Sequence, residues 1–258
     1  MRNNNYLCHY TSQKGLLGIL KQNKLWMTDI LYLNDSSEYF GTVKMVKAEL
    51  INYEDTTGKK KSLGPMLIEI NMEQRLSANS SHPYIFSLSE NKDDINQFRG
   101  YSPSIAGFCI EFDKTKLIAM VREKEGYKIQ ACIYNRTEII KSIFSNKADQ
   151  MSTIMNFVEN SAEFPFFKDE AFKTEKEYRI VYSGKSAEIK YREGKSMIIP
   201  YIEFPPEDAD VRLPITRIVV APTPHPALSK LSVLSLLKSK GYPEEVEVEE
   251  SAIPYRSW

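Results

Sequence analysis

Short runs in which apolar and polar residues alternate recur along the chain, and this two-residue period is typical of β-strands. The clearest run includes Phe108, Ile110 and Phe112, which alternate with smaller or polar residues. Predicted strands therefore lie at Tyr6–Tyr10, Leu25–Met27, Tyr84–Ser89, Ile105–Phe112, Glu177–Tyr182, Arg217–Ala221 and, as an edge strand, Val246–Val248.

Other segments repeat apolar residues every three or four positions, which is typical of one face of an α-helix. Residues that favour helix ends accompany several of them. The first predicted helix follows a Thr11-Ser12 cap with Leu16, Leu17 and Leu20 on one face, and the second begins at Asp35, with Glu38 completing a capping box, and continues through Tyr39, Val43, Val46 and Leu50. A polar helix and loop are predicted at 91–104, and a further helix at 147–162 with Met151, Ile154, Met155 and Val158 facing inward. The last predicted helix contains Leu228, Leu231, Leu234 and Leu237 and ends at Gly241.

The order of these elements predicts the fold class. Strands and helices interleave without the regular strand-helix alternation of a doubly wound parallel sheet. We therefore predict an α+β fold, formed as a single domain over residues 1–258. Residues 54–64 form the most loop-like stretch and predict a mobile surface loop.

The composition is that of a globular protein, with 42% hydrophobic and 26% charged residues. The 34 basic residues balance the 34 acidic ones, so net charge provides no general attraction to nucleic acids or anionic membranes. No apolar run approaches the roughly 18 residues that span a bilayer, and residues 1–5 lack the apolar core of a signal peptide. We expect a cytoplasmic protein without membrane contact.

Cysteines and histidines are too few and too scattered for a metal site. Cys8, Cys109 and Cys132 are widely spaced and odd in number, which favours free thiols over disulfides. With three histidines besides, no ligand set has zinc spacing, so we predict no metal. Neither a GxGxxG nor a Walker loop is present to bind phosphates.

The tripeptide His9-Tyr10-Thr11 is the first candidate site. It lies between a predicted strand and a predicted helix, where side chains can project into a cleft beside a helix N-terminus. The alternative interpretation is structural: His9 is half-buried and hydrogen-bonded, Tyr10 belongs to the core and Thr11 caps the helix.

The second candidate is Glu177, which begins an otherwise apolar strand. A carboxylate there must lie at a rim or in a polar cleft, because burial without a partner is costly. Glu177 and Arg179 share a strand face, so the competing interpretation is a surface ion pair of little energetic value.

Two further segments offer polar groups. Ser87 and Ser89 share one face of a predicted strand, and Arg99 and Tyr101 follow in a short segment with Phe98. An arginine can bind a phosphate and an aromatic ring can stack on a flat ligand, although each of these residues alone is more often structural.

Taken in order, these segments resemble the bacterial domain-of-unknown-function family 2971. The resemblance spans nearly the whole chain and lies in His-Tyr-Thr at 9–11, Leu-Asn-Asp-x-x-Glu at 33–38, Phe-Ser-Leu-Ser-Glu at 86–90, Gly-Phe-Cys-Ile-Glu-Phe at 107–112, Glu-Lys-Glu-Tyr-Arg-Ile at 175–180 and Ser-Ala-Ile-Pro-Tyr-Arg at 251–256. The chain departs from the family pattern at 98–102, where Phe-Arg-Gly-Tyr-Ser replaces a tryptophan followed by a Tyr-Ala step.

The order of the motifs is also similar to that of ADP-ribosyltransferases of the His-Tyr-Glu type. This resemblance implies a split, mixed or antiparallel central sheet flanked by helices, and NAD as the substrate. It implies that His9 holds a ribose hydroxyl of NAD, that a tyrosine such as Tyr101 packs on the nicotinamide, and that Glu177 stabilises the positive charge that develops on the ribose. The remaining NAD-binding candidates are Tyr10, Thr11, Ser87, Ser89 and Arg99, the last for the pyrophosphate, with Glu175 positioning the acceptor.

The residue types suit that chemistry. Cleavage of the bond between nicotinamide and ribose builds positive charge on the sugar, which a fixed carboxylate stabilises. A neutral histidine can donate one ring N–H to a ribose oxygen and accept at the other nitrogen.

The leading hypothesis is therefore an NAD-dependent ADP-ribosyltransferase acting on a protein or nucleic-acid acceptor, with a toxin or antiphage effector as its expected setting. An NAD glycohydrolase, in which water is the acceptor, is one alternative. The other is a non-catalytic sensor module that binds a nucleotide or a protein.

Overall fold

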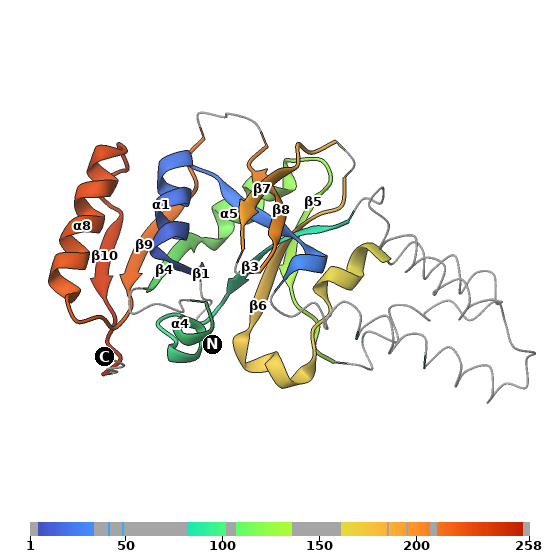
Figure 1. Cartoon of the computed structure of the whole chain (residues 1–258), viewed down its shortest axis with the longest axis horizontal. Coiled ribbons are helices and arrows are strands. Elements are labelled where there is room, and N and C mark those ends of the chain that lie inside the picture. The colour runs from blue at the N-terminus through green and yellow to red at the C-terminus, as the bar shows by residue number, and fades with distance from the viewer. Residues whose placement is uncertain are drawn as a thin grey trace, which may run out of the picture.

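The computed structural model describes residues 5–33, 41, 48, 82–101, 107–135, 161–184, 186–194, 196–206 and 211–254. Within these ranges, helices flank one ten-stranded sheet, which confirms the predicted α+β class (Figure 1). No helix of this part is both long and apolar enough to cross a membrane.

The sheet has the strand order β10-β9-β4-β1-β3-β2-β8-β7, and β6 joins it by pairing with both β3 and β5. All pairs are antiparallel except β10 with β9, so the sheet is mixed. The strands are β1 Tyr6–Ser12, β2 Leu25–Asp29, β3 Tyr84–Ser89, β4 Gly107–Asp113, β5 Tyr127–Ala131, β6 Glu177–Tyr182, β7 Lys190–Glu193, β8 Ile198–Phe204, β9 Ile215–Val220 and β10 Glu247–Glu250.

The sheet splits along one edge of β3. Strand β1 pairs with β4 along its whole length, but with β3 only where Cys8 faces Ser89. Strand β2 pairs with the other end of the same edge of β3, where Thr28 faces Ile85. Strand β6 pairs with the whole opposite edge of β3. One half of the sheet contains β1, β4, β9 and β10 and the other contains β2, β5, β6, β7 and β8; they meet at β3 and diverge between β1 and β2.

Helices cover the two faces of the sheet unequally. The larger core includes residues from α1 (Gln13–Gln22), α5 (Lys114–Arg122) and α8 (Pro226–Ser239), which pack on one face. On the other face, α4 (Ile95–Tyr101) contributes Phe98 to a smaller cluster with Cys8 and Tyr10. The 3-10 helices are η1 Ile30–Tyr32, η2 Ser161–Phe166 and η3 Glu170–Glu175.

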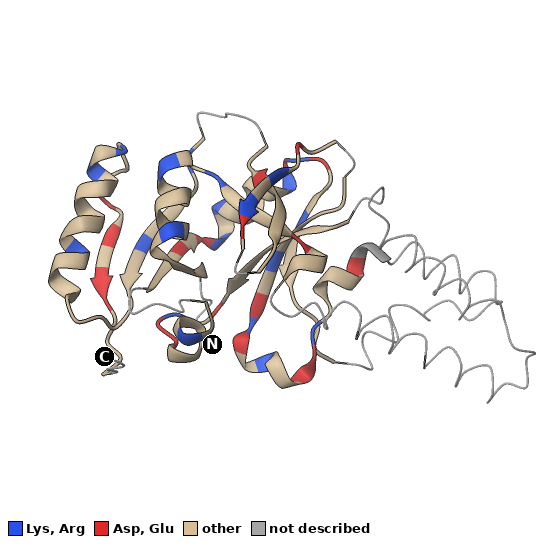
Figure 2. Ribbon diagram, viewed as in Figure 1, with Lys and Arg blue, Asp and Glu red and all other residues tan. Residues whose placement is uncertain are grey.

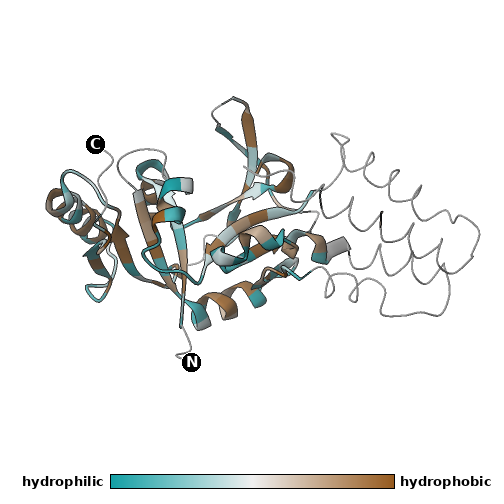
Figure 3. Ribbon diagram, turned by 90° about the horizontal axis from the view of Figure 1, so that it is seen from below, coloured by the Kyte–Doolittle hydropathy of each residue, from teal (hydrophilic) through white to brown (hydrophobic). Residues whose placement is uncertain are grey.

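Strand alternation divides the side chains between these two cores, as the sequence predicts. Phe108, Ile110 and Phe112 belong to the larger cluster, whereas Cys109 lies in the smaller one. The central strands accordingly carry many apolar positions (Figure 3). Cys8, Cys109 and Cys132 are buried, and in the described part of the chain none of them forms a disulfide.

Local signals explain where the helices begin and end. Ser12, rather than Thr11, caps α1, because its hydroxyl accepts the Gly15 N–H at 3.3 Å. At the far end of α8, Gly241 adopts the left-handed conformation with φ +63, which confirms the predicted end of that helix.

Two predicted apolar faces are wrong in detail. In α1, Leu16 and Leu20 are buried but Leu17 is 39% exposed. In α8, Val233 and Leu237 are the buried residues, whereas Leu228, Leu231 and Leu234 are exposed. A spacing of three rotates each successive residue by about 60° around the helix, so a long row of such residues turns away from the core.

Some predictions concern residues outside the described part of the chain, and some observed elements were not predicted. Three predictions lie outside the described residues: the helix from Asp35 through Leu50, the loop at 54–64 and the helix at 147–162. Within these ranges the structure describes only residues 41 and 48 and residues 161 and 162, which begin η2. The sequence patterns missed α5, β5, β7 and β8.

Candidate functional site

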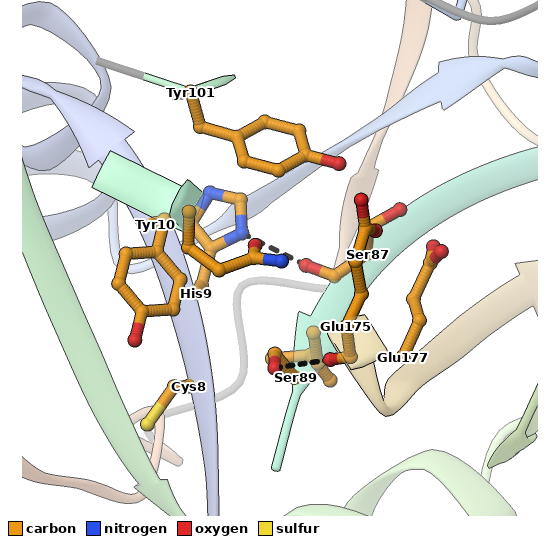
Figure 4. A pocket seen from close by; sticks show the side chains of 10 residues that line it. Cys8, His9, Tyr10, Ser87, Ser89, Tyr101, Glu175 and Glu177 are labelled. Carbon is orange, nitrogen blue, oxygen red and sulfur yellow. Dashed lines mark hydrogen bonds between the residues drawn. The ribbon is translucent and has the colours of Figure 1, made fainter. Parts of the chain in front are cut away.

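A pocket lies where β1 and β3 diverge, beneath α4 (Figure 4). Its empty volume is about 300 Å³, which includes open space at its mouth. It is lined by every predicted site residue except Thr11 and Arg99: the lining is Cys8, His9, Tyr10, Ser87, Leu88, Ser89, Gln97, Tyr101, Glu175 and Glu177.

His9 fills the gap between the diverging strands. Its ring stacks on Phe86 at a centroid distance of 4.2 Å, and its Nδ1 lies 2.9 Å from the Ser87 carbonyl oxygen. Because a carbonyl can only accept, Nδ1 carries the proton and Nε2 keeps its lone pair when the ring is neutral. His9 thus provides a partner for a carbonyl at the edge that the split leaves open.

The charge state of His9 follows from its surroundings. Burial lowers its pKa to about 4, against the opposing effect of the Ser87 carbonyl. The ring is therefore neutral at pH 7 and its remaining nitrogen is an acceptor. A ribose hydroxyl would have to donate to His9, which reverses the direction expected from the sequence.

Tyr10 shapes the wall of the pocket. Its hydroxyl donates to the Asn91 carbonyl at 2.9 Å and accepts the Asp94 N–H at 3.1 Å. Its ring packs edge-on against Phe98 at 5.0 Å, and only 4% of the residue is exposed. These contacts favour the structural interpretation of Tyr10 over a direct role in binding.

Ser89 is engaged in a similar way, whereas Ser87 faces the pocket more openly. The Ser89 hydroxyl donates to the Glu175 carbonyl at 2.6 Å and accepts the Asn91 N–H at 2.9 Å. Ser87 is half-buried, and within the described part of the chain its hydroxyl has no hydrogen bond. Of the two serines, Ser87 has the hydroxyl available to a ligand.

Helix α4 provides one side of the pocket through Gln97 and Tyr101. Tyr101 is 37% exposed and its ring extends over His9 (Figure 4). Gln97, which the sequence interpretation missed, is 6% exposed. The four-residue spacing of this pair was the available signal, because it places both side chains on one helix face.

Arg99 and Thr11 lie outside the pocket lining. Arg99 is exposed and is two residues from both Gln97 and Tyr101, which turns it to another side of α4. Thr11 is 8% exposed and lies against α1, where a Cβ at Gly15 would overlap its hydroxyl. The structure therefore does not place either residue with the other candidates.

Glu177 is held by two cations at the base of the pocket. Its Oε1 accepts from Arg179 Nε at 2.7 Å, and its Oε2 accepts from Lys168 Nζ at 2.6 Å and Arg179 Nη2 at 3.2 Å. All three residues are at most 6% exposed, so the interpretation of Glu177 and Arg179 as a surface pair is wrong. Burial alone would raise the Glu177 pKa, but Arg179 and Lys168 outweigh it and lower the pKa to about 2.

The backbone around this carboxylate is also fixed. The Glu177 N–H donates to the Tyr134 hydroxyl at 2.8 Å, and Arg179 Nη1 donates to the Pro165 carbonyl at 2.6 Å. Sequence reasoning missed Lys168 and Tyr134 because both reach Glu177 only through the fold of the segment before β6. A carboxylate held on several sides is preorganised, which is a requirement for stabilising charge in a transition state.

Glu175 lies at the edge of the pocket. Its Oε2 accepts from Lys168 Nζ at 2.7 Å, while 25% of its side chain is exposed. Lys176, in the left-handed conformation with φ 45, separates η3 from β6, so only Glu177 lies in the strand, as predicted. Lys168 thus links the two carboxylates.

The arrangement combines an ionised carboxylate, a neutral imidazole and an aromatic ring. Two carboxylates and two cations balance in charge, and the imidazole adds none at neutral pH. In the described part of the chain, no group of three or more metal-ligating side chains could hold a metal ion. The chemistry that these residues supply is fixed negative charge next to hydrogen-bond acceptors.

Together, the fold and site define an α+β protein with a split-sheet pocket. Residues 97–180, less than half of the chain, match the model of a family described as a protein of unknown function (DUF2971). The match supports that part of the resemblance and includes most of α4, Glu175 and Glu177 but not His9. Neither a curated protein nor a solved structure matches the chain.

Proposed function

We propose that the split-sheet pocket binds the nicotinamide ribose of NAD and that the protein transfers ADP-ribose to a macromolecular acceptor. One observation carries the proposal: a neutral His9 from β1, Tyr101 from α4 and an ionised Glu177 from β6 line the same pocket. Residues far apart in sequence thus converge on one pocket where the sheet divides.

Each side chain has a role that matches its environment. His9 Nε2 accepts a hydrogen bond from a ribose hydroxyl, because the N–H at Nδ1 of the same ring already donates to the Ser87 carbonyl. The exposed ring of Tyr101, which lies over His9 (Figure 4), packs on the nicotinamide. Gln97 adds an amide that can recognise the carboxamide group of the nicotinamide.

Glu177 stabilises the reacting sugar. When the bond from C1′ of the ribose to the nicotinamide nitrogen breaks, its electron pair neutralises the pyridinium ring and positive charge moves to the sugar. A fixed carboxylate favours this transition state over the ground state. Glu177 is suited to this role because Lys168 and Arg179 keep it ionised and immobile.

Glu175 positions the acceptor. The nucleophile of the acceptor donates a lone pair to C1′ and must lose a proton, and the partly exposed carboxylate at the pocket edge can receive it. Glu175→Gln is therefore expected to reduce transfer while sparing nicotinamide release, whereas loss of release in this variant would reverse the two roles.

A non-catalytic sensor is the second candidate, and the Lys168 and Arg179 contacts favour it. A carboxylate that already accepts from two cations is also what a purely structural network contains. In that case NAD or another nucleotide would bind and raise the melting temperature without being consumed.

Incubation with NAD and cell lysate, followed by mass spectrometry, separates these functions. Transfer predicts nicotinamide release together with a lysate component that carries ADP-ribose. Release of free ADP-ribose without a modified acceptor would identify a glycohydrolase. Thermal stabilisation by NAD with no release would support the sensor and contradict the proposed reaction.

A further inference from the structure

Arg192 lies on the same sheet face as the pocket. Its Nη2 donates to the Thr28 hydroxyl at 3.1 Å, and Thr28 faces Ile85 across the β2–β3 pair. Ser87, which lines the pocket, is two residues further along β3 and shares a face with Ile85. The Arg192 head group is therefore on the pocket side, within the half of the sheet that contains β2, β8 and β7.

The charge of Arg192 has no counterion in the described part of the chain. Its Nε is buried without a hydrogen-bond partner, and the hydroxyl of Thr28 is the acceptor that its guanidinium contacts. Other cations on the sheet differ: Arg179 pairs with Glu177, and the adjacent Lys190 pairs with Glu203 at 2.8 Å. A half-buried guanidinium whose Nε has no hydrogen-bond partner is a site that an anion can complete.

We propose that Arg192, together with the Thr28 hydroxyl, binds a phosphate group of the ligand whose sugar occupies the pocket, which for NAD is the pyrophosphate. This inference rests on the proposed function. It assigns to Arg192 the phosphate contact that the sequence suggested for Arg99. A planar guanidinium binds phosphate oxygens through two parallel hydrogen bonds, and the single bond of Arg192 to Thr28 uses one of its five N–H donors.

The spacing along the sheet agrees with one extended ligand. Two residues along β3 span roughly 7 Å, and one step between strands adds roughly 5 Å. The site at Thr28 is thus on the order of 10 Å from Ser87, a separation that one nucleotide with its phosphates can bridge. Burial also lowers the Arg192 pKa, as expected for a cation that lacks a counterion.

Calorimetric titration with three probes tests the inference. Inorganic pyrophosphate and ADP-ribose carry phosphates, whereas nicotinamide riboside offers the same reacting sugar without them. Arg192→Gln should weaken pyrophosphate and ADP-ribose binding by roughly tenfold or more and leave riboside binding within about twofold. Arg122→Gln, the same change on the exposed side of α5, is the matched control and should alter none of the three.

Thermal unfolding without ligand distinguishes binding from a structural role. Because the charge of Arg192 is uncompensated, Arg192→Gln should keep or raise the melting temperature. A lower melting temperature of Arg192→Gln with unchanged pyrophosphate affinity would overturn the inference. So would the absence of pyrophosphate binding by the unmodified protein. Loss of pyrophosphate binding in Arg99→Gln rather than in Arg192→Gln would overturn it as well. If NAD is cleaved normally by Arg192→Gln, the inference fails and the proposed function stands. If pyrophosphate binding depends on Arg192 but NAD is not cleaved, the inference stands and the reaction fails.

Discussion

His9 joins structure and proposed chemistry through its two ring nitrogens. Nδ1 donates to the Ser87 carbonyl and Nε2 is the nitrogen proposed to accept from the ribose, so substitutions can remove one role at a time. Asparagine places an amide N–H near the position of Nδ1 but has no counterpart of Nε2. Phenylalanine keeps the stacking on Phe86 but leaves the Ser87 carbonyl without its partner.

His9→Asn should therefore fold normally and bind NAD at least tenfold more weakly, whereas His9→Phe should lose binding and also about 1–3 kcal/mol of stability. Calorimetric titration with NAD and urea unfolding measure the two effects. Equal NAD affinity in His9→Asn and the unmodified protein would assign His9 a structural role alone.

The pH dependence of stability provides a second test at this residue. The His9 pKa is about 4 in the folded protein against 6.5 for an ordinary histidine, so the unfolded chain binds the proton more tightly. The stability that this gives is fully present above pH 6.5 and is lost as the pH falls toward 4. The Glu177 contribution is lost in a separate, lower window between 4.5 and about 2.

Urea unfolding at about pH 7 and about pH 5 should consequently show a larger loss of stability in the unmodified protein than in His9→Asn. Identical losses in the two proteins would show that the imidazole is not held neutral by the fold.

Single residues could be predicted from the sequence where a local pattern fixes their direction. Glu177 could be separated from Glu175 because it abuts an apolar strand. Lys168 and Tyr134 could not be found in this way, since their contacts with Glu177 depend on how the segment before β6 folds. Arg99 illustrates the opposite error: its chemistry is suitable, but the helical turn directs it away from the pocket.

At the scale of elements, the packing of α1 on β1 depends on a missing side chain. A Cβ at Gly15 would overlap the Thr11 hydroxyl, whereas nothing lies within 4 Å of a Cβ at Gly100 in α4. Alanine stabilises a helix over glycine by up to about 1 kcal/mol. At Gly15 the steric overlap with Thr11 opposes this gain and decides whether the substitution stabilises or destabilises the protein.

Gly15→Ala should thus destabilise the protein by about 1–3 kcal/mol, and a second change, Thr11→Ala, should recover part of that loss. Gly100→Ala, the matched control, should be neutral or slightly stabilising. Chemical denaturation gives all three values. A stabilising Gly15→Ala would show that α1 does not pack this closely on β1.

The predicted strands were those with one strongly apolar face or a buried run. Strand β7 was missed because it consists of Lys190-Tyr191-Arg192-Glu193, in which Tyr191 is 68% exposed. Helix α5 was missed because the run from Leu117 to Val121 is apolar throughout and shows no helical period, although only its two end residues are buried. Elements that bury little of their surface leave little periodicity in the sequence.

The split of the sheet belongs to the whole molecule. It depends on β3 pairing with β1, β2 and β6, which are far apart in sequence, and no local pattern specifies such pairings. The resemblance implied a split sheet, and the strand order now gives its location. Acidic and basic positions are mixed along the ribbon, in keeping with the balanced net charge (Figure 2).

One large core spans both halves of the sheet, with Leu7 and Ile110 on one side and Ile180 and Phe204 on the other. We therefore predict that the halves unfold together. The buried thiols of Cys8 and Cys109 report on one half and that of Cys132 on the other. All three should react with a thiol reagent over the same range of urea. Earlier labelling of Cys132 would show that the halves open separately.

The Glu177 charge is the central element of the proposed reaction, and a charge-balanced pair of variants tests it most directly. Glu177→Gln alone would leave Lys168 and Arg179 short of a carboxylate and cost on the order of 3–5 kcal/mol. The double variant Lys168→Met with Glu177→Gln removes one charge of each sign and leaves Glu175 and Arg179. Lys168→Met alone keeps the Glu177 charge and is the matched comparison.

The decisive measurement is the rate of nicotinamide release from saturating NAD, expressed per folded molecule. We predict release by the unmodified protein, and a rate in the double variant about 100-fold below that of Lys168→Met at a comparable melting temperature. Equal rates in these two variants, or no release by the unmodified protein, would contradict it.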